Sequence, residues 1–285
     1  MEKNKKKEWM MVALKCVIFA LCAGGMSTGL HMFNSIYIAH EHGKPAFVTN
    51  SLLIYSACEK IVFVIGYVTL GKKLQIKNGV LRGFTYMVLI WTSNMLPQFM
   101  GMAFADGEIA KQAFVMSDLI IDGTVYLLSG VVLGLLFRNI GDVAYVPCEK
   151  KKVRKAMLVS AIVFPVSIMV VDQIVAKVNV AFSSLGALQV SDEVKIPFYI
   201  NFYAWFILSG ALIALFYRMT EYGKGKNAWL SFGLKYGVFI WTPVVLIMIV
   251  FGTSALETIV FNFLFIACIL AVTWLTDKVL NQKSA

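Results

Sequence analysis

The chain has 285 residues, of which 59% are hydrophobic and only 15% are charged, and its formal net charge is +10. A soluble domain carries about 25% charged residues because its surface faces water, so this composition excludes an ordinary soluble protein. The positive charge is compatible with a nucleic-acid partner or with the basic cytoplasmic loops of a membrane protein.

Eight apolar segments follow one another along the chain, each bounded by charged or turn residues. A helix needs about 20 residues to cross a hydrocarbon core of about 30 Å, and every segment is that long. The runs lack the two-residue alternation of a membrane barrel strand. They cover residues 9–37, 46–71, 80–104, 112–137, 154–177, 197–218, 229–251 and 255–276. The sequence therefore predicts an all-α polytopic integral membrane protein with about eight transmembrane helices.

These segments divide the chain into five regions. They are a basic N-terminus (1–8), a first four-helix half (9–137), a basic loop (138–153), a second four-helix half (154–276) and a tail (277–285).

The distribution of Lys and Arg predicts the orientation. With the N-terminus inside, 19 of these residues fall in cytoplasmic segments and four fall in external loops. Positive charge accumulates on the cytoplasmic side, so both termini are expected there, in the inner (plasma) membrane of a bacterial cell. The same distribution accounts for the net charge without nucleic acid. We expect the run Lys150–Lys155 to contact anionic lipid head groups.

Two of the segments resemble each other. Residues 83–92 read GFTYMVLIWT and residues 233–242 read GLKYGVFIWT, identical at six of ten positions without a gap. The two segments are four spans apart and point in the same direction. This favours two parallel four-helix repeats, as in some transporters. Chance similarity between two apolar helices is the alternative.

Charges inside a bilayer are expensive and mark functional sites by default. Glu59 lies twelve residues from the cytoplasmic end of its span, or about 18 Å deep, and Lys60 follows it directly. Adjacent residues on a helix do not face each other, so we expect each to have a partner on another helix. A structural ion pair and a role in ion coupling both remain open for Glu59.

The fourth span carries a polar stripe. Asp118, Asp122, Tyr126 and Ser129 share one face, and Gly123, Gly130 and Gly134 form a close-packing flank beside it. Two carboxylates one turn apart raise each other's proton affinity. Asp122 is therefore expected to carry a coupling proton or ion, and Asp118 to bind solute. A cap at the start of the helix is the alternative for Asp118.

Other polar residues gather in the outer halves of the spans. Pro97 and Pro243 predict broken helices at matching positions of the two halves, a feature of transporter binding sites. We expect an outward-facing pocket, unless these groups serve stability alone. The expected solute-binding residues are His31, Asn34, Asn94, Gln98, Asp118, Asp172 and Gln173.

The chain has no P-loop, G-x-S-x-G, H-E-x-x-H or C-x-x-C motif, so we expect no cofactor and no metal. We favour a secondary carrier or permease subunit for a small polar or ionic solute over an enzyme. An intramembrane enzyme acting on a lipid or lipid-linked substrate is the first alternative, with Asp118, Asp122 and His31 as its acid, base or metal ligands. A sensor, immunity or assembly subunit without a site is the second.

Overall fold

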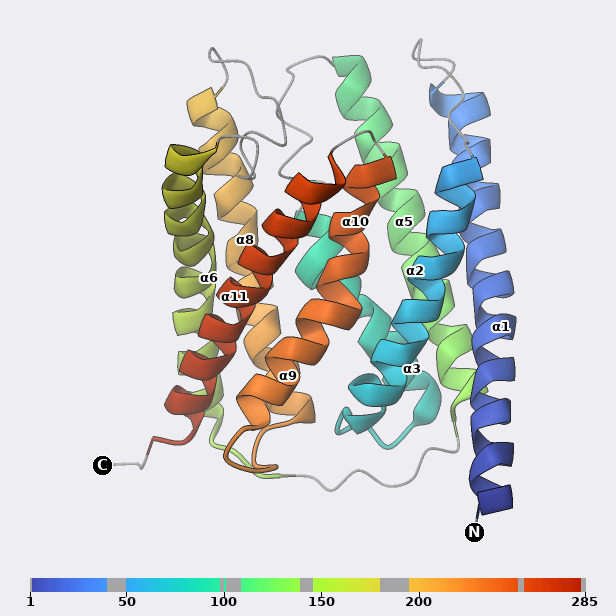
Figure 1. Cartoon of the computed structure of the whole chain (residues 1–285), viewed down its shortest axis with the longest axis horizontal. Helices are drawn as coiled ribbons and strands as arrows, with labels where there is room; N and C mark the ends of the chain where they lie inside the picture. The colour runs from blue at the N-terminus through green and yellow to red at the C-terminus, as the bar shows by residue number, and fades with distance from the viewer. Residues whose placement is uncertain are drawn as a thin grey trace.

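The computed structural model describes residues 2–39, 50–97, 100, 109–138, 146–179, 195–250 and 254–282. Over these ranges every element is helical and no strand occurs. Each continuous helical stretch counts once, which gives eight helices (Figure 1). They are α1 (Glu2–Phe33) with π turn η1 (Asn34–Ala39), α2 (Asn50–Thr69), α3 (Gly79–Ile90) with π turn η3 (Trp91–Met95), α5 (Ile109–Leu136), α6 (Lys150–Val178), α8 (Lys195–Thr220), α9 (Ala228–Tyr236) with π turn η5 (Gly237–Trp241) and α10 (Thr242–Val250), and α11 (Ala255–Leu280). A short 3₁₀ turn, η2 (Gly71–Lys73), follows α2.

Six of these helices are long and apolar enough to cross a membrane. Their apolar spans are Trp9–Tyr37, Ile54–Lys73, Met116–Leu136, Lys150–Val178, Tyr199–Thr220 and Ala255–Leu280. The chain is therefore a polytopic α-helical membrane protein, as predicted. α3 and the α9–α10 stretch are not among the six, so the total of eight spans stays a prediction.

The predicted irregularities lie in these two helices. In each of them a π turn ends two residues before a proline, η3 before Pro97 and η5 before Pro243. Proline lacks the N–H that would bond to the preceding turn, so the ladder is interrupted there. Polar side chains donate hydrogen bonds to backbone carbonyl groups of η5. The Thr242 hydroxyl donates to Gly237 O (2.9 Å), and Asn94 Nδ2 donates to Ile240 O (2.8 Å).

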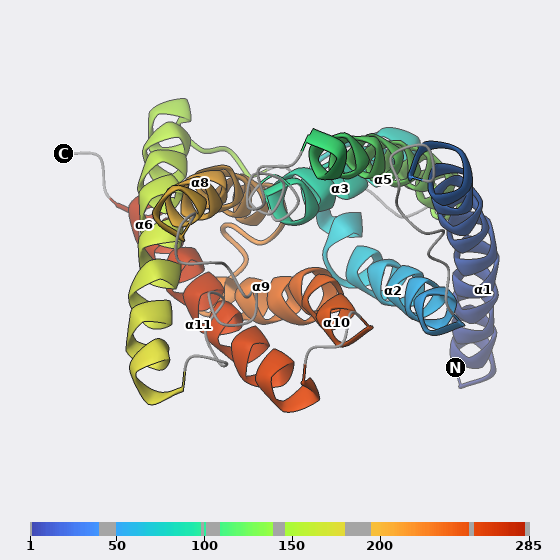
Figure 2. The same ribbon diagram turned by 90° about the horizontal axis from the view of Figure 1, so that it is seen from above.

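The helices form two groups of four that meet along α2, α3, α8 and α10 (Figure 2). In the first group α1 packs against α2 and α5, and α3 packs against α5. In the second group α6 packs against α8 and α11, and α9 packs against α11. Between the groups, α2 contacts η5 and α10, while α8 contacts η3. α1 begins and α11 ends at the same end of the bundle, here called the terminal end (Figure 1).

A close approach of α3 to α5 explains the glycines predicted to form a packing flank. A Cβ on Gly83 would come within 2.4 Å of the Gly134 nitrogen and 2.6 Å of the Gly130 oxygen. A Cβ on Gly123 would meet the Trp91 ring at 2.9 Å. Only residues without a side chain fit at this spacing, so the flank holds α5 in place and turns its polar stripe toward α1 and α2.

Candidate functional site

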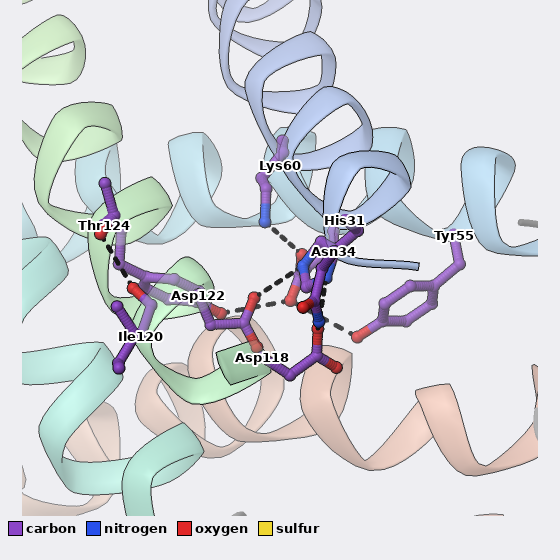
Figure 3. A network of polar contacts seen from close by, with 10 residues as sticks. His31, Asn34, Tyr55, Lys60, Asp118, Ile120, Asp122 and Thr124 are labelled. Carbon is purple, nitrogen blue, oxygen red and sulfur yellow. Dashed lines mark hydrogen bonds and ion pairs between the residues drawn. The ribbon is translucent and has the colours of Figure 1, made fainter. Parts of the chain in front are cut away.

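His31 of α1 lies between two carboxylates of α5 (Figure 3). Its Nδ1 is 3.0 Å from Asp118 Oδ1, and its Nε2 is 3.1 Å from Asp122 Oδ1. Asp118 Oδ1 also accepts a hydrogen bond from Asn34 Nδ2 (2.8 Å), and the Ser117 hydroxyl donates to Asn34 Oδ1 (2.8 Å). A neutral imidazole donates from one nitrogen only, whereas an imidazolium donates from both. The geometry therefore suits a positively charged ring between two negative groups.

Helix periodicity places these groups correctly. His31 and Asn34 are three residues apart, and Asp118 and Asp122 are four apart, so each pair shares a face of its helix. α5 begins at Ile109, nine residues before Asp118. The alternative interpretation of Asp118 as a helix-start cap was therefore wrong.

A second charged group lies on α2. Lys60 Nζ is 2.5 Å from Glu59 Oε2, and both side chains are almost fully buried. The argument that adjacent residues cannot pair was therefore wrong, because both side chains are long enough to converge beside α2. The expected partner on another helix is present as well, since Tyr126 of α5 contacts both. Neighbours complete the site: the hydroxyls of Tyr126 and Tyr55 approach Glu59 Oε1 at 3.3 and 3.5 Å. The Lys60 ammonium also lies over the rings of Tyr126 and Phe63, 5.2 and 5.6 Å from their centroids.

The His31 bridge and the Glu59–Lys60 pair belong to one arrangement. Tyr126 stands one turn after Asp122 on the same face of α5 and donates to Glu59, so it bridges the two acidic sites. We call this set the charged network; it consists of His31, Asn34, Tyr55, Glu59, Lys60, Asp118, Asp122 and Tyr126. Figure 3 labels all of these except Glu59 and Tyr126. It contains three carboxylates and two basic groups, so one negative charge is not balanced within it when all are ionised.

Exposure falls along the five charged side chains of the network, from His31 to Lys60. The side chains of His31 and Asp118 are 23% and 21% exposed, Asp122 is 10% exposed, and Glu59 and Lys60 are 5% and 3% exposed. His31 lies near the end of α1 remote from the terminal end. The partly exposed charged side chains of the network thus lie toward that end, and the most buried ones lie toward the middle of the bundle.

The remaining predicted site residues lie elsewhere. Asn94 is fully buried and binds Ile240 O between η3 and η5. Asp172 is buried in the second group, where it accepts a hydrogen bond from Tyr203 (2.8 Å), and Gln173 beside it is exposed. Gln98 lies outside the described residues. The structure therefore brings together His31, Asn34, Asp118, Asp122 and Glu59, but not the full predicted set.

Sequence reasoning missed Tyr55, Ser117 and Tyr203 as members of polar sites. Tyr55 could have been found, since it precedes Glu59 by four residues and so shares its face of α2. Its hydroxyl also donates to Pro243 O (2.5 Å), which ties the network to the proline break in the second group. Tyr203 gives no sequence signal, because its pairing with Asp172 depends on which helices are neighbours.

Comparison with protein-family models, with curated proteins and with solved structures finds no significant match. Among the residues that the structure describes, no group of three or more His, Cys, Asp or Glu side chains is arranged to hold a metal ion. The function must therefore be argued from the geometry of the charged network.

Proposed function

We propose that this protein is a transport protein of the bacterial inner membrane, a secondary carrier or permease subunit for a small polar or ionic solute. The observation that carries the proposal is the charged network within the apolar spans. A single charge costs about 2.5–3.5 kcal/mol at the centre of a membrane helix. Five ionisable groups whose charges do not balance are poorly explained by stability alone, since interhelical hydrogen bonds in membranes contribute only about 0.6 kcal/mol each.

In this proposal the network takes up solute and a coupling ion. His31 and Asp118 are the most exposed part and, with the buried Asn34 that binds Asp118, form the entrance to the solute site. Asp122 and Glu59 lie deeper and hold the coupling proton or cation that neutralises the unbalanced charge. The decreasing exposure of the charged side chains supports this order. A solute that enters from the end remote from the terminal end reaches His31 first. Asp172 of the second group and Asn94, which joins η3 to η5 where the two groups meet, are assigned to the same pathway.

The irregular helices support the proposal. The Tyr55 hydroxyl donates to Pro243 O (2.5 Å) and lies 3.5 Å from Glu59 Oε1, so it connects Glu59 to the break in the α9–α10 stretch. Carriers commonly bind solute beside discontinuous helices, where backbone groups are free to interact and the helix can bend.

The two groups of helices support a parallel duplication. Every packing pair described for the first group has its counterpart in the second, and the contact of α2 with η5 matches that of α8 with η3. Burial repeats as well: each buried position from Glu59 to Gly71 is buried again 150 residues later, from Ser209 to Glu221. The same spacing relates Gly83 to Gly233. We infer that the chain arose from two copies of a four-helix unit.

Among the residues that the structure describes, the second group has no counterpart of the Glu59–Lys60 pair. Ser209 and Gly210 stand at the positions that match Glu59 and Lys60, and a Cβ on Gly210 would meet Ser160 O at 2.1 Å. At these two positions of the second group, close packing of helix backbones takes the place of the charged side chains of the first group. We assign ion coupling to the first group and a supporting role to the second.

Orientation and lipid contacts complete the proposal. The distribution of the loop charges favours a cytoplasmic terminal end, and we propose that the partly exposed end of the network faces the outside. Lys150, Lys151, Arg154 and Lys155 are exposed at the start of α6, at the expected level of the head groups. We propose that they contact anionic lipids there.

A binding screen tests the proposal. The purified protein is heated with amino acids, sugars, organic acids, amines and inorganic ions, and its unfolding temperature is recorded. We expect at least one solute to stabilise the wild type and not Asp122→Asn. Asp277→Asn is the matched control, because Asp277 binds Tyr217 at the terminal end (2.5 Å) and should keep the response.

The lipid-enzyme alternative has a separate readout. Lipid head groups are compared in cells with and without the gene. Unchanged head groups agree with a carrier, whereas a lost or gained lipid species would contradict it.

A further inference from the structure

A cluster of ion pairs joins the two groups of helices at the terminal end, far from the charged network. Glu221, just after α8, forms an ion pair with Lys73 of η2. Lys235 of α9 approaches the same carboxylate oxygen at 3.6 Å. Lys73 belongs to the first group, while Glu221 and Lys235 belong to the second. One carboxylate therefore links the two groups.

Hydrogen bonds beside Glu221 make the same connection. The Gln75 backbone N–H donates to Met219 O (3.2 Å), and Arg218 Nη1 donates to Gln75 Oε1 (3.2 Å). Arg218 Nη2 also donates to Val146 O in the loop that joins the groups (2.6 Å). The turn after α2 is thus held against the end of α8 through both backbone and side chains.

The charged side chains at this contact differ in their exposure to solvent. The Glu221 side chain is only 5% exposed, whereas those of Lys73 and Lys235 are each 30% exposed. Lys224 follows in the same loop, and burial, together with the nearby Lys73 and Lys235, lowers its pKa, while Glu221 opposes this. Several lysines therefore depend on one buried carboxylate. Neutralising that carboxylate leaves like charges facing each other across the contact.

We propose that Glu221, with Lys73 and Lys235, is a latch that holds the terminal ends of the two groups together and opens to release solute toward the cytoplasm. The latch rests on the proposed carrier function, since a carrier must open at each side in turn. In this structure the latch is closed, and the partly exposed members of the charged network lie toward the opposite end; the proposal assigns this arrangement to an outward-facing state.

The lysine side of the latch suits reversible opening. Lys73 and Lys235 are partly exposed, so water solvates their ammonium groups as soon as the contact separates. Breaking the pairs therefore leaves no buried cation without a partner. Glu221 is the member that depends on the contact. It is therefore the residue to change.

Distance measurement between two spin labels tests the latch. The five cysteines (Cys16, Cys22, Cys58, Cys148 and Cys268) are first replaced by alanine. Labels are then placed at Lys77→Cys and Lys226→Cys, exposed positions in the turns after α2 and α8. Pulsed electron paramagnetic resonance in lipid nanodiscs gives the distance distribution without any solute.

We expect one short distance in the parent and an added longer population in Glu221→Gln. Glu149→Gln is the control, because Glu149, the exposed residue just before α6, pairs with Lys152 in the first turn of that helix (3.3 Å) and its replacement should leave the distribution unchanged. An unchanged distribution in folded Glu221→Gln would overturn the proposal. If that variant does not fold, Lys73→Gln carries the same expectation and the same contrary outcome.

Failure of the latch and failure of the carrier proposal are distinguishable. The distance distribution reports on the latch alone, whereas solute binding and uptake report on the carrier.

Discussion

At the residue scale, the charged network depends on mutual neutralisation. His31 satisfies Asp118 and Asp122 together, and Lys60 satisfies Glu59 within 2.5 Å. Taking a partner away leaves a charge in a poorly hydrated place, which costs more than the pair contributes. Paired substitutions can therefore separate the cost of an orphaned charge from the value of the interaction.

The buried pair on α2 gives the larger effect. We expect Glu59→Gln and Lys60→Met each to lower the free energy of unfolding by about 3–5 kcal/mol, because each leaves its partner buried and unpaired. The double variant should be more stable than either single one. Denaturant unfolding in detergent measures all three. Additive losses in the double variant would contradict the pairing.

The His31 bridge gives a smaller effect because it is partly exposed. We expect His31→Ala to destabilise the protein by about 1–3 kcal/mol, since two carboxylates then face each other without a donor between them. Adding Asp122→Asn to His31→Ala should recover part of that loss by removing the repulsion. No recovery in a thermal unfolding assay would show that His31 and Asp122 do not interact.

At the element scale, the helical period predicts which side chains share one face of a helix. It does not predict which helices pack against each other. The polar stripe of α5 and its glycine flank followed from spacing alone, and the structure confirms both. The partner of the stripe could not be predicted, because the spacing of residues within α5 does not indicate that His31 of α1 faces it. The ion pair of Glu59 with Lys60 was missed for a different reason. Helix angles describe Cβ directions, and these long side chains bend back toward each other.

Close packing at the α3–α5 contact gives a test of the element scale. Gly83→Ala places a methyl group within 2.4 Å of the Gly134 backbone, which cannot move aside without shifting the helix. We expect a loss of about 1–3 kcal/mol in unfolding free energy. Gly25→Ala is the matched control: a methyl group on Gly25 would meet nothing within 4 Å, so that variant should be neutral or slightly stabilising. Equal losses in both variants would contradict the packing described.

At the scale of the whole molecule, composition was enough to predict a polytopic helical membrane protein, because long apolar runs leave no other way to satisfy the backbone in lipid. The correspondence between the two groups was visible in only ten residues of sequence. Most of it lies in which positions are buried rather than in which residues occupy them, so the structure was needed to extend it.

Orientation can be tested in intact cells. In the background without native cysteines, we expect Ser254→Cys to react with a membrane-impermeant maleimide from outside. Lys226→Cys should react only after the cells are permeabilised, since its loop carries the positive charge typical of the cytoplasmic side. Both positions are exposed in the structure. The reverse labelling pattern would contradict the orientation, and with it the proposal that the charged network faces the outside.

Gradient-driven uptake into proteoliposomes tests the central claim most directly. Purified wild type, Asp122→Asn and Asp277→Asn are reconstituted, a proton gradient is imposed, and accumulation of the solute panel is measured. The account predicts that wild type and Asp277→Asn accumulate at least one solute, and that Asp122→Asn loses this accumulation while remaining folded. Accumulation by wild type no greater than in protein-free liposomes, or normal accumulation by Asp122→Asn, would contradict it.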